Sequence, residues 1–118
     1  MKFKRHSRTI KSFQDAEAAL GSKDSKKLEN NTVLVRLDEN RIVVQLHQTN
    51  VVTYCRYGDI VLNSGGYRSA TTKDRINGYA PCAGLFQKGG EWFLSTVDGP
   101  KPFTDGIKVY PLASCRIV

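Results

Sequence analysis

Residues 32–62 read TVLVRLDENRIVVQLHQTNVVTYCRYGDIVL, and their apolar side chains recur at every second position. This period of two is typical of β-strands that bury one face. Two apolar sets are each expected to share one face of a strand: Val33, Val35 and Leu37, then Ile42, Val44 and Leu46. Short polar turns separate four such runs, so the stretch predicts an antiparallel meander of four strands.

A short helix is predicted upstream of the meander, in SFQDAEAALG at residues 12–21. Its apolar side chains recur at helical spacing: Phe13, Ala16, Ala19 and Leu20. Ser12 is the expected N-cap, with Asp15 as its reciprocal partner, and Gly21 is expected to end the helix. The next segment, GSKDSKKLENN at residues 21–31, is polar and rich in serine and lysine, and we expect it to be exposed.

Downstream of the meander the alternation stops at Ser64 and the paired glycines Gly65 and Gly66. Glycine adopts backbone angles closed to other residues, so a bulge, a tight turn or a close approach to a ligand is expected here. A second short helix is predicted to follow. Thr71 or Thr72 is its expected N-cap, and Gly78 is expected to end it.

The last third of the chain predicts further β-structure. AGLFQK and EWFLST flank residues 88–90, Lys-Gly-Gly, and predict a second hairpin, and another strand is expected around residues 107–110. The order of elements predicts an α+β fold: an antiparallel β-meander, as a curved sheet or partial barrel, with an N-terminal helix and a short central helix. At 118 residues, the chain is expected to form a single domain, residues 1–118.

The charge balance is strongly basic, with 18 Lys and Arg against 11 Asp and Glu and a formal net charge of +7. Residues 1–11 form the densest basic run, without an acid, and are expected to be a mobile arm. This balance favours anionic partners. No apolar stretch approaches the roughly 20 residues needed to span a bilayer, and no signal-peptide core follows the basic start. We therefore expect no membrane association and a cytosolic protein.

Cysteine and histidine are sparse, and their spacing indicates neither a metal site nor a catalytic one. Cys55, Cys82 and Cys115 lie far apart, which favours free thiols that pack as small hydrophobic side chains. These cysteines and His47 form no C-x-x-C or H-x-x-x-H spacing, so no metal and no cofactor is expected. Nucleophilic catalysis needs a base and an orienting group, and no orienting group can be named near Cys55. The chain is therefore predicted not to be an enzyme.

The strongest candidate site is an anion-binding loop followed by a helix start. Its predicted ligand-binding residues are Ser64, Gly65, Gly66, Thr71, Thr72, Lys73 and Arg75. A helix N-terminus presents free N–H groups and partial positive charge, to which hydroxyls and two cations are added here. The spacing is not that of a P-loop, so ATP hydrolysis is not indicated. A structural interpretation stays open, in which the threonines cap the helix, Arg75 pairs with a nearby acid and the glycines form a bulge.

The second candidate is a nucleic-acid surface that mixes aromatic and basic side chains. Its predicted residues are Lys4, Arg5 and Arg8 in the basic arm, with Tyr54, Arg56, Tyr57, Tyr67 and Arg68. Such mixtures stack bases and follow phosphates on β-sheet surfaces. No signature of a sequence-specific nucleic-acid-binding motif is present, so sequence-specific recognition is not expected. Tyr54 alternates with Val52 and can equally belong to the core.

Residues 46–77, LHQTNVVTYCRYGDIVLNSGGYRSATTKDRIN, carry three motifs in order: L-H-x-T, S-G-G followed by an aromatic residue, and T-T-K-x-R-[IL]-N. The motif positions are Leu46, His47, Thr49, Ser64, Gly65, Gly66, Tyr67, Thr71, Thr72, Lys73, Arg75, Ile76 and Asn77. This pattern resembles a family of small uncharacterised proteins encoded by tailed bacteriophages. The resemblance implies a phage origin and an accessory role, and it implies no activity.

Two functions of different classes follow. The first is a non-enzymatic phage accessory protein that binds an anionic ligand, either a nucleic acid or a nucleotide, through residues 64–77. The alternative is a protein–protein inhibitor of a host or anti-phage defence enzyme, as in counter-defence of the anti-CRISPR type. Either protein would act in the host cytoplasm. A homodimer is a further expectation, because IVLN at residues 60–63 or the C-terminal strand can form an exposed edge.

Overall fold

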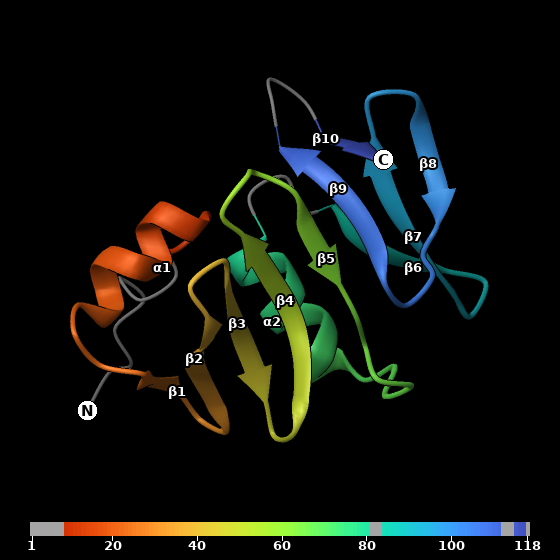
Figure 1. Ribbon diagram of the computed structural model, residues 1–118. Helices are drawn as coiled ribbons and strands as arrows, with labels where there is room; N and C mark the ends of the chain where they lie inside the picture. Colours follow the sequence, from red (N-terminus) through yellow and green to blue (C-terminus); the bar gives the residue numbers. More distant parts are fainter. Residues whose placement is uncertain (1–8, 81–83, 112–114, 118) are drawn as a thin grey trace.

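The computed structural model describes residues 9–80, 84–111 and 115–117 (Figure 1). Most of the predicted basic arm, residues 1–8, lies outside the described residues. The helices are α1 (Phe13–Leu20) and α2 (Ala70–Tyr79). The strands are β1 (Ser25–Glu29), β2 (Thr32–Asp38), β3 (Arg41–Leu46), β4 (Thr49–Cys55), β5 (Ile60–Leu62), β6 (Leu85–Lys88), β7 (Glu91–Thr96), β8 (Gly99–Pro102), β9 (Ile107–Pro111) and β10 (Cys115–Ile117).

The larger sheet has seven strands in the order β1-β2-β3-β4-β5-β9-β10, and every neighbouring pair is antiparallel. The smaller sheet, β6-β7-β8, is inserted in the chain between β5 and β9. Among the described residues β1 and β10 do not pair with each other, so the larger sheet is open and is not a closed barrel. The predicted α+β class, with a meander, an N-terminal helix and a central helix, is confirmed.

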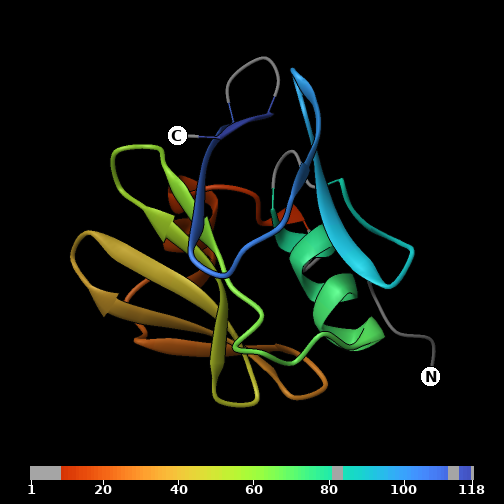
Figure 2. The same cartoon turned by 90° about the vertical axis from the view of Figure 1, so that its right-hand side faces the viewer.

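One hydrophobic core fills the space beside the larger sheet. Both helices pack on β3 and β4. Figure 2 shows α2 and the smaller sheet standing on the same side of the larger sheet. Buried side chains of the helices, the larger sheet and the smaller sheet join in a single cluster, to which Phe13, Ile42, Ile76 and Trp92 belong. The protein is therefore layered, with a sheet on one side and two helices and a second sheet on the other.

Tyr54 lies at the centre of this core rather than on a nucleic-acid surface. Its side chain is fully buried, and its hydroxyl donates a hydrogen bond of 2.6 Å to the carbonyl of Tyr79 in α2. Burial raises its pKa far above the usual value, and the neighbouring Tyr79 adds to this. The assignment of Tyr54 to a nucleic-acid surface is therefore wrong, and its alternation with Val52 placed it correctly in the core.

The three apolar side chains of β2 that were predicted to share one face, Val33, Val35 and Leu37, lie on the face that is not fully buried. Leu34 is fully buried, whereas Leu37 is 43% exposed. The prediction for β3 is confirmed, because Ile42, Val44 and Leu46 are all buried. The buried face of β2 carries only one apolar side chain, Leu34, so the alternation of β2 by itself does not identify this face as the buried one. The pairing of Leu34 with Val44 decides it, since directly opposed residues share a face.

The two ends of the larger sheet are β1 and β10. The segment at residues 21–31 is exposed as predicted except at Leu28 and Glu29, and it also contains β1, which was not predicted. Only Leu28 and Glu29 of β1 are buried, so the strand depends on backbone pairing with β2 and shows no alternation. β5, the first part of the IVLN segment, is not an edge, because it pairs with β4 and β9. The strands β8 and β10 were not anticipated.

Ser12 caps α1 as predicted, but Asp15 is not its reciprocal partner, because the Asp15 carboxylate accepts from the Lys11 N–H. The cap of α2 lies earlier than predicted. The Ser12 hydroxyl accepts from the Asp15 N–H at 3.1 Å, and Gly21 follows the helix with a φ of 61°. α2 is capped by Ser69 rather than by either threonine, because the Ser69 hydroxyl reaches the Thr72 N–H. The helix also continues past the predicted end at Gly78 to Tyr79.

Candidate functional site

The predicted anion loop satisfies its own donors. The Asp105 carboxylate accepts from the Ser64 N–H at 2.8 Å and from the Ser64 hydroxyl at 2.7 Å. The Gly65 N–H donates to the Asn63 side chain at 2.8 Å, and the Gly66 N–H donates to the Ser64 hydroxyl at 3.2 Å. An anion at this loop would have to displace these internal acceptors. The loop therefore acts as a structural turn beside the site.

Gly65 is required where the turn meets β4. Its φ is +64°, and a Cβ placed on it would lie 2.7 Å from two atoms of the Thr49 side chain. A side chain at this position would thus be strained in its backbone and would clash with its neighbour. The close approach expected of the glycine pair is made to the protein itself. It brings the S-G-G motif into contact with the threonine of L-H-x-T.

The two predicted cations are engaged by other side chains of the protein. The Arg75 guanidinium forms ion pairs with Asp74 at 2.7 Å and with Glu29 at 3.5 Å, and its Nε donates to the Thr32 hydroxyl at 2.8 Å. Lys73 lies over the Trp92 ring at 5.7 Å from its centroid. The structural interpretation of Arg75 as the partner of an acid is confirmed. The structure does not bring these cations together with the helix start.

Arg68 joins the turn to the smaller sheet. Its Nε donates to the Ser64 hydroxyl at 3.0 Å, and its guanidinium lies 3.9 Å from the Asp105 carboxylate. The same group lies over the rings of Trp92 and Phe103, at 5.0 and 5.1 Å from their centroids. Burial alone would raise the pKa of Asp105, but hydrogen bonds from Ser64 and the charge of Arg68 lower it below its usual value. Arg68 therefore holds the loop in place.

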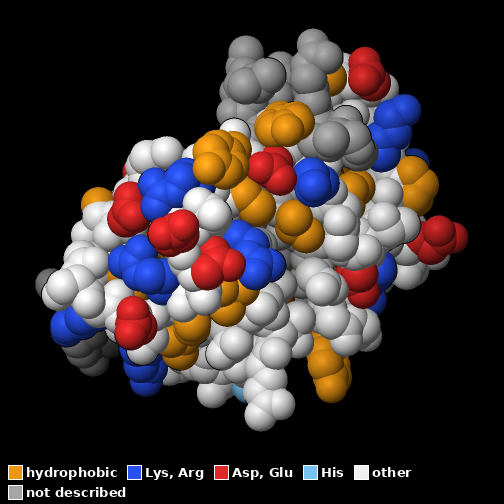
Figure 3. All heavy atoms as spheres, in the orientation of Figure 1, with side chains coloured by type: hydrophobic (Ala, Val, Ile, Leu, Met, Phe, Trp, Pro, Cys, Tyr) orange, Lys and Arg blue, Asp and Glu red, His pale blue; other side chains and the backbone are white. Residues whose placement is uncertain are grey.

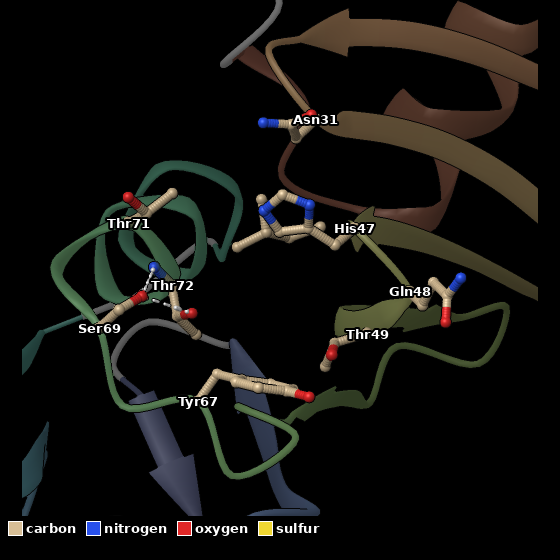
Figure 4. Close-up of a pocket in the computed structure, with 9 residues that line it drawn as sticks. Asn31, His47, Gln48, Thr49, Tyr67, Ser69, Thr71 and Thr72 are labelled. Carbon is tan, nitrogen blue, oxygen red and sulfur yellow. Dashed lines mark hydrogen bonds between the residues drawn. The ribbon is translucent and has the colours of Figure 1, made fainter.

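A pocket of about 820 Å³ opens at the start of α2 (Figure 4). We call it the α2 pocket, and it is lined by Asn31, Leu46, His47, Gln48, Thr49, Tyr67, Ser69, Thr71 and Thr72. Three separate parts of residues 46–77 meet here: the turn between β3 and β4, the loop after β5, and the first turn of α2. The motifs that suggested the phage resemblance therefore converge on one concave site.

Two aromatic rings flank the opening. His47 reaches toward α2 from the turn between β3 and β4, and Tyr67 lies on the opposite side of the opening (Figure 4). Tyr67 is 69% exposed. His47 has a φ of +55°, and its N–H donates to the Asn31 carbonyl at 2.8 Å. The left-handed backbone of His47 could not be seen in the sequence, because turns at such angles usually carry glycine or asparagine.

The first turn of α2 supplies polar groups and no charged side chain to the pocket. The Ser69 hydroxyl accepts a hydrogen bond from the Thr72 N–H. The Thr71 N–H lies in the first turn, where backbone N–H groups have no carbonyl acceptor inside their own helix. Thr71 is exposed and lines the opening. Among the residues that the structure describes, no Lys or Arg lines the α2 pocket. Positive potential inside it comes from the helix end rather than from cations.

The remaining predicted nucleic-acid residues do not form one surface. Lys4, Arg5 and Arg8 lie outside the described residues. Arg56 lies over the Phe13 ring at 4.7 Å and beside Glu17 at 3.7 Å, next to an 82% exposed Tyr57. Tyr67 and Arg68 follow β5, so they lie at the other end of β4 and β5 from the turn that carries Arg56 and Tyr57.

Acidic and basic side chains intermix on the face of the larger sheet that Figure 3 shows. Arg41 pairs with Asp38 at 2.8 Å, and Lys108 pairs with Asp59 at 3.7 Å. A polyanion is attracted by a continuous track of one sign of charge. The described part of this face therefore does not favour binding along a nucleic-acid strand.

A second, smaller pocket of about 450 Å³ lies at the start of α1. We call it the α1 pocket, and it is lined by Ser12, Phe13, Gln14, Cys55, Tyr57, Gly58, Ile60 and Tyr110. Burial raises the pKa of the Cys55 thiol, and the nearby Asp59 carboxylate raises it further. Cys55 is a free thiol, and the side chains of Cys82 and Cys115 lie outside those described. A thiol with a raised pKa is a poor nucleophile at neutral pH.

Two further features of the described residues bear on the function. No group of three or more His, Cys, Asp or Glu side chains is placed to hold a metal ion in this part of the chain. Among the same residues, neither helix has the length and apolar character needed to cross a membrane.

The fold and the α2 pocket define a small α+β protein whose concave site is built from a β-turn, a glycine turn and a helix start. Residues 9–110 match the family model described as Kyanoviridae Gp96 protein. The chain therefore belongs to the Kyanoviridae Gp96 protein family, which is a phage protein family. The prediction that the chain belongs to a phage protein family is confirmed. That the three motifs are the shared pattern of this family stays a prediction. No curated protein and no solved structure matches the chain.

Proposed function

We propose that this protein is a non-enzymatic phage accessory protein that binds a nucleotide, free or at the end of a nucleic acid, in the host cytoplasm. The α2 pocket is the observation that carries the proposal. Its volume of about 820 Å³ suits a ligand of nucleotide size, since small-molecule sites commonly measure about 300–1,000 Å³. The ligand's anionic group lies at the start of α2, and its remaining part lies between the turns.

The electrostatics of the helix start support an anion at this end of the pocket. The first turn of α2 contains no acid that would neutralise it. A helix N-terminus carries about half a positive charge, and its first N–H groups face outward. Thr71 adds a hydroxyl at the opening. The proposed contacts are thus fewer than the sequence suggested, because Ser64 and Arg75 have internal partners.

Substituting Thr71 tests the proposal without disturbing the core. Thr71→Glu places a carboxylate in the second position of the helix, where it stabilises the helix by about 0.3–1 kcal/mol and repels an anionic ligand. Thr71→Gln is the matched neutral control. We expect nucleoside monophosphates to bind the wild type and the Gln variant, and the Glu variant to bind at least about tenfold more weakly.

Isothermal titration calorimetry and thermal shift, with nucleoside monophosphates and short single-stranded DNA and RNA, provide the measurement. A wild-type protein that binds none of these ligands would end the proposal. So would equal binding by the Glu and Gln variants, because the anion would then lie elsewhere.

The α1 pocket favours a second candidate function, the inhibition of a host or anti-phage defence enzyme by direct binding. Tyr57 is 82% exposed and Tyr110 is 39% exposed at the rim of this pocket. Exposed tyrosines are frequent anchors in protein interfaces. A pull-down from infected cells would then recover a host protein with the wild type and with Tyr67→Ala, but not with Tyr57→Ala. Recovery that is equal with all three proteins would exclude this candidate surface.

A further inference from the structure

We infer that the α2 pocket holds a planar heteroaromatic ring, the base of a nucleotide, between His47 and Tyr67. This inference rests on the proposed function and assigns the part of the ligand that lies farther from the helix start. The two rings come from different turns and lie on opposite sides of the opening (Figure 4). Bases stack on the faces of tyrosine and histidine in many nucleic-acid-binding proteins, and such stacking tolerates any base.

The conformation of His47 supports a role for its side chain. The residue has a φ of +55° in the connection between β3 and β4, where glycine or asparagine is less strained. The fold uses the backbone of His47, whose N–H donates to the Asn31 carbonyl. Among the described residues its imidazole makes no hydrogen bond or ion pair. The imidazole is exposed and lines the α2 pocket, so it is available as a ligand contact.

Tyr67 is held by its backbone and by its neighbour, not by its ring. Its N–H donates to the Ser64 carbonyl at 3.0 Å, and the adjacent Arg68 is fixed to Asp105 and to the smaller sheet. The ring itself is 69% exposed. The backbone that carries the ring is fixed, and a tyrosine has only two side-chain torsions, so ordering the ring on a ligand costs less than ordering a long flexible side chain. The anchored loop therefore presents a stacking platform.

The charge of the pocket lining favours a single nucleotide as the ligand over a long nucleic-acid strand. No Lys or Arg lines the α2 pocket within the described residues. Proteins that follow a strand neutralise many phosphates with cations, whereas one phosphate can be held at a helix start. Asn31 and Thr49 at the rim offer an amide and a hydroxyl, which can both donate to and accept from the edge of a base. The site therefore suits a mononucleotide or a nucleic-acid terminus.

Four variants separate ring stacking from folding. His47→Gly keeps the left-handed backbone and removes the imidazole, so the thermal midpoint should stay the same or rise while nucleotide affinity falls at least about tenfold. Tyr67→Ala should weaken binding by a similar factor. Tyr67→Phe, which keeps the ring face, should stay within about threefold of the wild type. Tyr57→Ala, at the other end of β4 and β5, is the matched control and should bind like the wild type.

NMR spectroscopy gives the direct readout. With a nucleoside monophosphate bound, we expect nuclear Overhauser contacts from its base protons to the rings of His47 and Tyr67. We also expect a nucleoside without phosphate to bind weakly at the same rings, and inorganic phosphate to leave the ring signals unshifted.

Two results would overturn the inference in distinguishable ways. If the wild type binds nucleotides but His47→Gly and Tyr67→Ala bind equally well, the base lies elsewhere and only the proposed function survives. If the wild type binds neither nucleotides nor nucleic acids, the proposed function and the inference both fail.

Discussion

Both helices begin at a serine N-cap, Ser12 in α1 and Ser69 in α2, and each helix start lines a pocket. The first turn of α1 contains an acidic side chain, Asp15, whose carboxylate accepts from the Lys11 N–H at 3.0 Å. At α2 the first turn contains no acid. A carboxylate in the first turn offsets the positive end of a helix. The α2 start therefore keeps the potential that a ligand anion can use.

The two pockets also differ in how their walls are held. The α1 pocket is bordered by the turn of Tyr57 and Gly58, where Arg56 lies over the Phe13 ring. The α2 pocket is bordered by a loop that Asp105 fixes through hydrogen bonds to Ser64. The wall of the α2 pocket is therefore held by hydrogen bonds to a carboxylate, and that of the α1 pocket by a cation over an aromatic ring.

The largest effect is expected from a substitution at Gly65. Gly65→Ala combines a strained φ with a contact of 2.7 Å to Thr49, so it should lower the free energy of unfolding by about 2–4 kcal/mol. Gly66→Ala is the matched control, because its φ is +85° but its Cβ would meet no atom within 4 Å, and it should cost only about 1–2 kcal/mol. Urea unfolding measures both. Equal losses would show that the contact with Thr49 is unimportant.

A smaller effect is expected from the helix caps. Ser12→Ala and Ser69→Ala each remove a hydroxyl that accepts from a backbone N–H, at 3.1 Å in both helices. Each should lower the free energy of unfolding by about 1 kcal/mol. Only Ser69→Ala should also weaken nucleotide binding, because only α2 borders the proposed site. Loss of nucleotide binding in Ser12→Ala would remove the distinction between the two helix starts.

A comparable or smaller effect is expected from Asp105→Asn, and it depends on pH. The pKa of Asp105 is lowered in the folded state, so its charge stabilises the fold above the unfolded pKa of about 3.9. That contribution is lost as the pH falls through the folded pKa. About a third of the side chain is exposed, so the loss should be about 1 kcal/mol at pH 7. Urea unfolding from pH 7 to pH 2 should show wild type and variant converging in acid, and a constant difference would contradict this.

The smallest effect concerns the Cys55 thiol in the wall of the α1 pocket. Burial and Asp59 raise its pKa, so little thiolate forms at pH 8. Iodoacetamide should therefore modify Cys55 more slowly than it modifies free cysteine, and Asp59→Asn should speed the reaction. Peptide mass spectrometry separates Cys55 from the other cysteines. A reaction as fast as that of free cysteine would show that the α1 pocket does not perturb this thiol.

Most of the secondary structure was predicted correctly from local patterns in the sequence. The alternation in β3 and the Gly89-Gly90 turn placed strands and a hairpin correctly, because both features act between near neighbours. The failures have a common cause. β1 carries no alternation and depends on pairing with β2, and the buried face of β2 is chosen by the register of Leu34 against Val44. Pairing and register are not local properties of the strand concerned.

Only part of the candidate site was predicted from the sequence. Thr71 and Tyr67 do line the α2 pocket, and their motifs were visible in the chain. Ser64 and Arg75 seemed equally suitable from the sequence, but Ser64 binds Asp105, which is distant in the sequence. Arg75 pairs with the adjacent Asp74 and with Glu29 of β1. Residue types alone cannot say which donors already have acceptors.

The sequence was sufficient to predict the class of the fold, the meander and the serine cap of α1. It also showed that the chain is basic and that it resembles phage proteins. These depend on residue period, on glycine and serine chemistry, and on composition, all of which act over a few residues or over the whole chain. The tertiary structure alone decided which face of β2 is buried and that Ser64 is bound to Asp105. It also decided that His47 meets the start of α2 in one pocket. Such outcomes depend on contacts between distant segments, whose partners are chosen only when the sheets and helices pack.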